Sequence, residues 1–206
     1  MSIGLIARKA GMTQVFAADG TMVAVSVLEV APNVVTRLRT PERDGYAALQ
    51  LGTGERAKVT KPVAGQLKGL PSLANLREFR VAAASDLEGL EIGQRLAVGD
   101  VFSEGDLVDV TGVSKGKGFA GHVKRHGFSR GPTTHGSDHH REPGSIGPGT
   151  TPGRVYRGLR MAGHMGDEQV TTKKVRVVRA DAEKNLLLLQ GSVPGARGSL
   201  ILVRKA

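Results

Sequence analysis

The sequence of 206 residues contains no cysteine, which excludes disulfide bridges and thiolate metal ligands and is compatible with a reducing compartment. It has no apolar run approaching the roughly 18 to 20 residues that a membrane-spanning helix needs. Its first residues, MSIGLIARKAGMTQVF, lack the apolar core and cleavage site of a secretory signal. These absences predict a soluble, cytoplasmic protein. The length of 206 residues is enough for one large domain or two small ones.

The charge of the sequence is strongly positive and unevenly distributed. The net charge is +10, and the stretch from Gly112 to Met165 carries nine Lys and Arg against two acids, a net +7. All six histidines lie in the same stretch. Such asymmetry favours a polyanionic partner, with nucleic acid as the first candidate and an anionic membrane as the second.

Short β-branched and aliphatic runs, separated by turn signals, lie on both sides of the basic stretch. They are MTQVF, the run TMVAVSVLEV after an Asp19-Gly20 turn, Val34-Val35, residues 47–51, DLVDV, VRVV, LLLLQ and SLILV. One short helix, from Thr60 to Leu70, is weakened by two glycines. Many short strands with few helices predict a mainly β fold, a barrel with a small α/β elaboration.

Between DLVDV and VRVV the β pattern stops for about sixty residues, far more than the roughly 4 to 6 of an ordinary loop. Ser129 to Arg154 has one apolar side chain, Ile146, with four prolines, six glycines, three histidines and three arginines. At its start, a short helix over residues 119–126 beside two lysines is predicted to bind phosphate. The whole segment can order only against a surface that supplies negative charge, as RNA does. A solvated surface loop is the alternative interpretation.

Three further patterns suggest other chemistry. Residues 127–131 match G-x-S-x-G around Ser129, but the preceding strand and following helix of a nucleophile elbow are not predicted. His122 and His126 are spaced to share a helix face, although no standard zinc spacing is present. Residues 112–117 are one residue short of a Walker loop. Although each pattern is incomplete, a hydrolase that uses Ser129 or a histidine-bound metal remains the alternative function. Phe119, Phe128 and Tyr156 lie among the basic residues, where they can stack on bases or seat the segment on the protein.

Several motifs, in the same order along essentially the whole chain, resemble the bacterial ribosomal protein L3 family. The main one is FSEGDLVDVTGVSKGKGFAGHVKR, residues 102–125. The others are GLIARKAGMTQVF at the N-terminus, PGSIGPGTTPGRV, MAGHMG and DAEKNLLLLQGSVPGARGSL.

This resemblance implies a body with a β-barrel like that of translation factors plus a small α/β subdomain, residues 1–111 and 167–206. Residues 112–166 are then a long, mostly irregular RNA-binding arm that reaches toward the peptidyl transferase centre. The implied role is that of a structural constituent of the large subunit in the cytoplasmic ribosome, which binds large-subunit ribosomal RNA and supports early assembly. The resemblance further implies large-subunit proteins fourteen and nineteen as neighbours, no membrane partner, and no catalytic residue, cofactor or metal.

The residues predicted to contact ribosomal RNA are the basic and histidine side chains of the arm, with two residues of the N-terminal motif. They are Arg8, Lys9, Lys115, Lys117, His122, Lys124, Arg125, His126, Arg130, His135, His139, His140, Arg141, Arg154, Arg157, Arg160 and His164.

Overall fold

The computed structural model describes residues 3–206. The chain divides into two compact units: the first runs to Ser114 and resumes at Gln169, and the second comprises Lys115–Glu168. Strands form most of the regular structure, so the prediction of a mainly β protein is confirmed. Among the described residues, no helix is long and apolar enough to cross a membrane.

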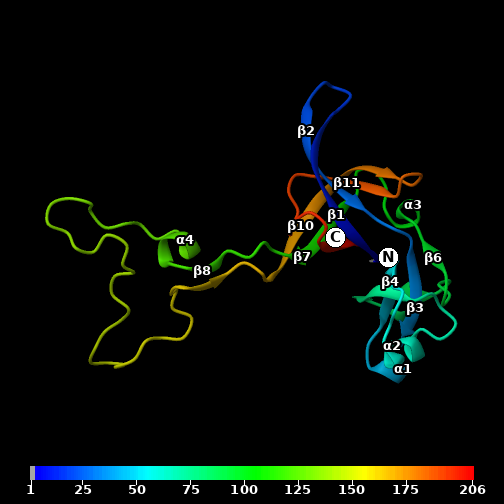
Figure 1. Cartoon of the computed structure of the whole chain (residues 1–206), viewed down its shortest axis with the longest axis horizontal. Helices are drawn as coiled ribbons and strands as arrows, with labels where there is room; N and C mark the ends of the chain where they lie inside the picture. The colour runs from blue at the N-terminus through cyan, green and yellow to red at the C-terminus, as the bar shows by residue number, and fades with distance from the viewer. Residues whose placement is uncertain (1–2) are drawn as a thin grey trace. The chain divides into compact units, whose positions relative to one another are not determined.

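The first unit contains a closed barrel of antiparallel strands in the order β1, β12, β7, β10, β11, β2 (Figure 1). These strands are β1 (Gly4–Phe16), β2 (Met22–Glu29), β7 (Leu107–Val113), β10 (Gln169–Asp181), β11 (Leu186–Gln190) and β12 (Leu200–Lys205). Alternate residues of a barrel strand face the interior, and here they are aliphatic. Val108 and Val110 of β7 and Leu187 and Leu189 of β11 are fully buried. The period-2 pattern of these runs is therefore what fills the barrel.

A second, four-stranded sheet in the order β5, β4, β3, β6 completes the first unit. It contains β3 (Asn33–Arg39), β4 (Ala48–Glu55), β5 (Leu73–Arg80) and β6 (Arg95–Leu96), with helices α1 (Pro41–Asp44), α2 (Lys61–Gln66) and α3 (Val98–Val101) and the 3-10 turn η1 (Ala84–Leu87) in the connections. Leu49, Leu51 and Phe79 of this sheet belong to the same buried cluster as the barrel residues. The first unit thus has one hydrophobic core that sheet and barrel share.

The side chain of Asn33 ties β3 to the first strand of the barrel. Its Oδ1 accepts a hydrogen bond from the Ile6 N–H at 2.9 Å, and its Nδ2 donates to the Ile6 carbonyl at 3.1 Å. Asn33 and Ile6 are both fully buried. Since a buried polar group needs partners, the asparagine amide acts here as a substitute for a neighbouring strand.

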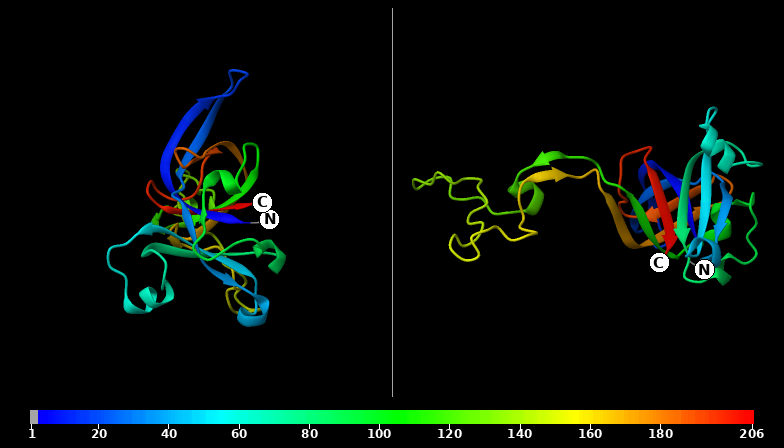
Figure 2. Two further views of the ribbon diagram at one scale, coloured as in Figure 1. Left: turned by 90° about the vertical axis from the view of Figure 1, so that its right-hand side faces the viewer. Right: turned by 90° about the horizontal axis from the view of Figure 1, so that it is seen from below.

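Beyond the barrel, β1 and β2 continue as a two-stranded hairpin (Figures 1 and 2). The hairpin ends with the pair Phe16 and Met22, and the connection contains Gly20 at a φ of 82°. The Thr21 N–H donates to the Asp19 carboxylate at 2.9 Å. The predicted Asp19-Gly20 turn is confirmed. Gly20 supplies the positive φ of the tight connection, and the Asp19 carboxylate supplies the acceptor for the Thr21 N–H.

The segment that separates the two halves of the first unit leaves and re-enters the barrel on paired strands. β7 continues through Val113, whose Cα partner on β10 is Gln169. The structure therefore divides the chain after residues 114 and 168, whereas the sequence predicts divisions after 111 and 166. The difference arises because β7 continues through Gly112 and Val113, so the barrel pairing extends past the predicted boundary at residue 111.

Candidate nucleic-acid interface

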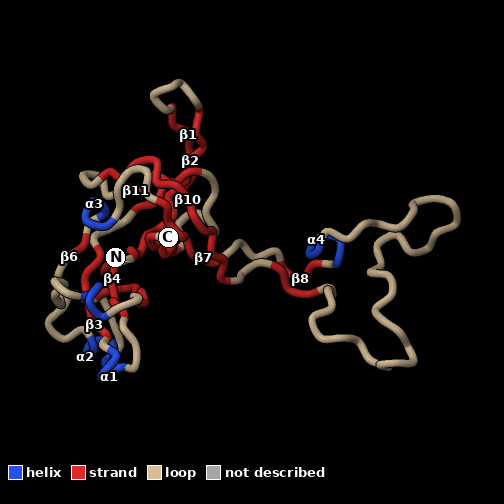
Figure 3. Tube along the Cα trace, turned by 180° about the vertical axis from the view of Figure 1, so that it is seen from behind, coloured by secondary structure: helices blue, strands red, loops and turns tan. Residues whose placement is uncertain are grey.

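The second unit begins and ends in a small ordered base. Strand β8 (Gly118–Ala120) pairs with β9 (Gly163–Met165), and the Lys117 N–H donates to the Met165 carbonyl at 2.9 Å. The short helix α4 (His122–His126) follows β8 and ends at Gly127 in the left-handed conformation. The helix predicted over residues 119–126 thus starts three residues later, since Phe119 lies in β8. Figure 3 shows these elements, with the rest of the unit drawn as loop.

Two of the residues predicted to contact RNA, Arg125 and His126, also make contacts within this base. The Arg125 guanidinium donates through Nη1 to the Met161 carbonyl at 2.8 Å, and His126 Nε2 lies 2.9 Å from the same oxygen. A Cβ atom at Gly163 would lie only 2.7 Å from Arg125 Nη1, so glycine leaves room for the guanidinium. These contacts fasten the returning strand to α4.

The three aromatic residues of this unit have different environments. The Phe128 ring stacks on His122, with centroids 6.0 Å apart, and lies 5.7 Å from the His126 ring. Phe119 and Tyr156 are 80% and 56% exposed. Phe128 therefore packs within the unit, whereas Phe119 and Tyr156 offer free faces to a base. The Arg154 guanidinium lies 5.4 Å from the Tyr156 ring centroid, so cation and ring face solvent together.

From Gly127 to Ala162 the chain has neither helix nor strand (Figure 3). A few local contacts shape its first part. His140 Nδ1 lies 2.8 Å from the Pro132 carbonyl, and His139 Nδ1 lies 2.6 Å from the Glu142 carboxylate. Nearly every residue here is exposed, and the unit contributes nothing to the main apolar cluster. The segment has no core of its own, as its composition predicts.

The cationic side chains of the second unit all face solvent. The exposed residues are Lys115, Lys117, Lys124, Arg125, Arg130, Arg141, Arg154, Arg157 and Arg160. His135 and His164 are also exposed. Arg and Lys side chains of the first unit form ion pairs with acids, such as Arg39–Glu78 and Lys205–Asp106. The second unit therefore presents a dense positive charge on a chain with little apolar packing.

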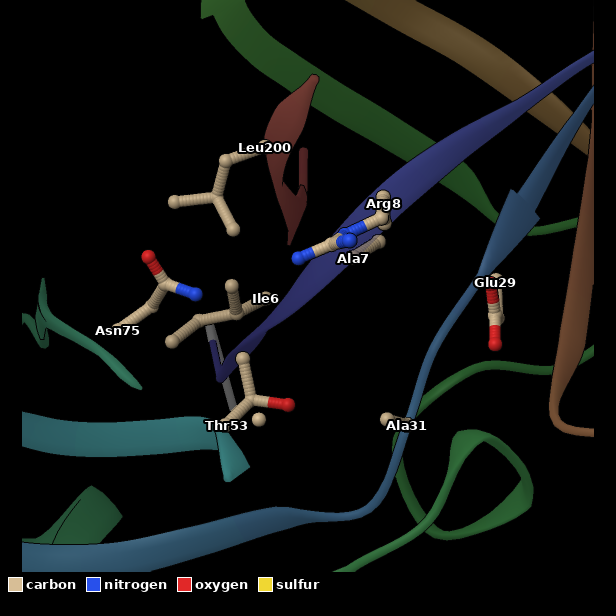
Figure 4. Close-up of a pocket in the computed structure, with 9 residues that line it drawn as sticks. Ile6, Ala7, Arg8, Glu29, Ala31, Thr53, Asn75 and Leu200 are labelled. Atoms are coloured by element: carbon tan, nitrogen blue, oxygen red, sulfur yellow. The ribbon is translucent and has the colours of Figure 1, made fainter. Parts of the chain in front are cut away.

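Arg8 and Lys9, the two predicted contacts outside this unit, differ from each other. Arg8 is exposed and lines a pocket of about 150 Å³ (Figure 4). Glu29 also lines this pocket and is the residue opposite Arg8 in the pairing of β1 with β2. Lys9 is buried, and its ammonium donates to the carbonyls of Val193 and Gly195 at 2.8 and 3.1 Å. The Lys9 ammonium is therefore engaged within the protein, whereas the Arg8 guanidinium is open to solvent.

The other patterns do not gather into a reactive site. Ser129 follows α4 rather than a strand, and the chain after it is irregular, so the context of a nucleophile elbow is missing. Within residues 3–206 no three His, Asp or Glu side chains converge as metal ligands. His122 and His126 contact Phe128 instead.

Substitution of Arg125 by alanine is expected to loosen the base of the second unit and leave the first unit unchanged. The variant loses a charged hydrogen bond worth about 1 to 2 kcal/mol, so the amides of β8 and β9 should exchange with solvent roughly 10-fold faster. Hydrogen exchange measured by mass spectrometry tests this. Lys124→Ala, on the same helix and exposed, serves as the control; equal exchange in both variants would show that the Arg125 contact stabilises nothing.

Comparison with known proteins shows close relatives along the whole chain. The family model described as Ribosomal protein L3 matches residues 59–186. The large ribosomal subunit protein uL3 of Alkalilimnicola ehrlichii is 53% identical over 211 residues, covering 100% of this chain and 96% of the relative. The protein of the same name from Herpetosiphon aurantiacus is 51% identical, covering 98% and 96%. That from Bacillus cytotoxicus is 49% identical, covering 100% and 98%.

Proposed function

Because the chain belongs to the ribosomal protein L3 family, we propose that it is a structural constituent of the large subunit of cytoplasmic ribosomes and binds large-subunit ribosomal RNA through its second unit. The family is one of ribosome components, not enzymes. The observation that carries the RNA-binding proposal is the exposure of all nine Lys and Arg of residues 115–168 on a segment without a core. Such a segment gains order and charge neutralisation together when it meets phosphates.

The finer parts of the proposal are supported by the family resemblance. The barrel and small sheet of the first unit form the globular body, and the arm, residues 112–166, extends toward the peptidyl transferase centre. There its Gly- and Pro-rich tip, around residues 144–153, fits between RNA elements. The protein acts early in subunit assembly and lies beside large-subunit proteins fourteen and nineteen. Its barrel resembles that of translation factors.

Limited trypsin digestion of the full chain, free and with large-subunit ribosomal RNA, tests the proposal. The free protein should be cut first at Arg154, Arg157 and Arg160, because these exposed residues lie on an irregular chain. Bound RNA should protect them. Arg56 and Lys58 lie on an exposed connection of the first unit and provide the internal control, since their cleavage should not change.

Cleavage at the three arginines with equal rates in the presence and absence of RNA would contradict the proposal. Anionic lipid vesicles replace the RNA in a parallel digestion. Protection by vesicles but not by RNA would show that the basic segment binds a membrane surface instead.

A further inference from the structure

Strand β10 contains one residue more than its partner β7 at the position of Asp109. Thr172 pairs with Val110 and Val175 pairs with Val108, so Lys173 and Lys174 together oppose Asp109. Lys174 has a φ of 54°, unusual for a residue with a side chain. In a regular strand Lys174 would stand opposite Val108 and point into the barrel. The bulge instead puts both lysines on the outside, and both are exposed.

Asp109 holds this bulge and a third cation. Its Oδ1 accepts the Lys174 N–H at 3.0 Å, and its Oδ2 lies 3.4 Å from Nη2 of Arg204, its direct partner on β12. The Asp109 side chain is only 12% exposed, whereas that of Arg204 is 50% exposed. Both carboxylate oxygens are thus engaged by the barrel, and the ammonium groups of Lys173 and Lys174 remain directed toward solvent.

A groove of about 320 Å³ lies along this outer face of the barrel, between β10, β7 and β12 and the edge of β5. Its polar lining includes Arg80, Lys173, Arg204, Thr111, Thr171 and Gln169. The hydroxyls of Thr111 and Thr171 lie 2.8 Å apart across the strands. Cations, hydroxyls and an amide are the side chains that most often contact the phosphates and sugars of nucleic acids.

The acids of the groove are already neutralised within the protein. Glu78 accepts hydrogen bonds from Arg39 at 3.1 Å and from the Tyr46 hydroxyl at 2.8 Å. Burial acts to raise the pKa of Glu78, but the hydrogen bonds from Tyr46 and Arg39 lower it more. The pKa of Glu78 therefore lies below its ordinary value, and its carboxylate is ionised and paired with these two side chains. The Arg80 guanidinium lies 4.9 Å from the Tyr46 ring centroid, beside this network. The groove therefore offers positive charge without a free carboxylate to repel phosphate.

We propose that this groove and the two bulge lysines bind the sugar–phosphate backbone of ribosomal RNA independently of residues 115–168, with Asp109 as the residue that positions the cations. The inference rests on the proposed function, since it takes ribosomal RNA as the ligand. It adds a second, rigid contact on the body. Because strands fix the spacing of these cations, binding here requires no ordering of the chain, in contrast to the irregular segment.

The test uses the full chain with alanine at both Lys173 and Lys174, bound to large-subunit ribosomal RNA. The loss of two phosphate contacts should flatten the slope of log K against log salt by about 1.4 to 1.8. Hydroxyl-radical footprinting of the RNA should lose one protected segment and keep those protected by residues 115–168. The control is Lys58→Ala with Lys61→Ala, two exposed lysines elsewhere in the first unit, which should alter neither result.

Two variants of Asp109 separate positioning from general electrostatics. Asp109→Asn and Asp109→Ala remove the same negative charge, so a purely electrostatic effect would strengthen RNA binding equally in both. The asparagine retains an oxygen that can accept the Lys174 N–H, whereas alanine does not. We expect Asp109→Ala to weaken binding by roughly 5- to 10-fold, about one phosphate contact, and Asp109→Asn to bind nearly as wild type.

An unchanged slope and footprint for the double lysine variant, with normal binding by wild type, would overturn this inference alone. If wild type itself failed to bind the RNA, the proposed function would fall and the inference with it. The lysine variant is decisive even where an Asp109 variant unfolds, because both lysines lie on the surface.

Discussion

Replacing Arg154, Arg157 and Arg160 by alanine should lower the affinity for large-subunit ribosomal RNA by roughly 100- to 500-fold at about 0.1 M salt. All three arginines are exposed on a chain without regular structure. If each meets a phosphate, each releases about 0.7 to 0.9 counterions, a factor of about 5 to 8 at this salt concentration. The slope of log K against log salt should then flatten by roughly 2 to 3 units.

The matched control is a triple alanine variant of Arg43, Arg56 and Arg95. These arginines are equally exposed but lie in the first unit, away from the groove of β10, β7 and β12. The control removes the same net charge, so any loss of affinity that it shows measures the general electrostatic effect. Equal losses in the two variants would contradict a direct role for the arginines of residues 154–160.

Deletion of Arg130 to Gly153, with a short glycine linker in its place, should leave a folded barrel with a cooperative melt. The main apolar cluster contains no residue between Val110 and Val175, so the deleted chain contributes no core packing. The contacts of Arg125 and His126 with Met161 also stay. We expect the melting midpoint to stay within about 4 °C of wild type, equivalent to a change of roughly 1 kcal/mol.

The same deletion should disturb the ribosome more than the protein. Seven of the nine exposed cations of the second unit remain, so RNA binding should weaken by roughly 25- to 60-fold, about two phosphate contacts. Large subunits reconstituted with the variant should assemble but show altered peptidyl transfer or antibiotic sensitivity. Normal transfer and drug response would mean that the tip only fills space. Loss of the cooperative melt would mean that the segment belongs to the folding core.

The sequence predicted the strands that are rich in aliphatic and β-branched residues. DLVDV, VRVV, LLLLQ and SLILV became β7, β10, β11 and β12. It missed β5, LANLREFR, because three of its eight residues are charged and only Leu73 and Phe79 are buried. It also missed the first half of β1, where Leu5 and Ile6 are both buried since opposite faces of the strand meet the barrel interior and the small sheet. Contacts with distant parts of the chain stabilise these strands, and such contacts cannot be recognised from a local sequence pattern.

Of the candidate interface, the sequence revealed the charge but not how each cation is used. The burial of Lys9 and the contact of Arg125 with a carbonyl depend on chain segments 184 and 36 residues away. The bulge lysines left a weak signal. Two consecutive lysines between Thr172 and Val175 break the alternation of β10, and one of them would have to face the core unless a residue is inserted. Only the register reveals that Asp109 opposes both.

The pairing of Val113 with Gln169 affects how the sequence between these two residues can evolve. The intervening 55 residues form a loop whose two ends are already held at one hydrogen-bonded position. In polymer terms, closing a flexible loop twice as long costs only about 0.6 kcal/mol more. Insertions and deletions beyond the β8–β9 base are therefore nearly neutral for the stability of the barrel. Natural selection can adjust the reach of the loop to its surroundings while the barrel sequence evolves under separate constraints.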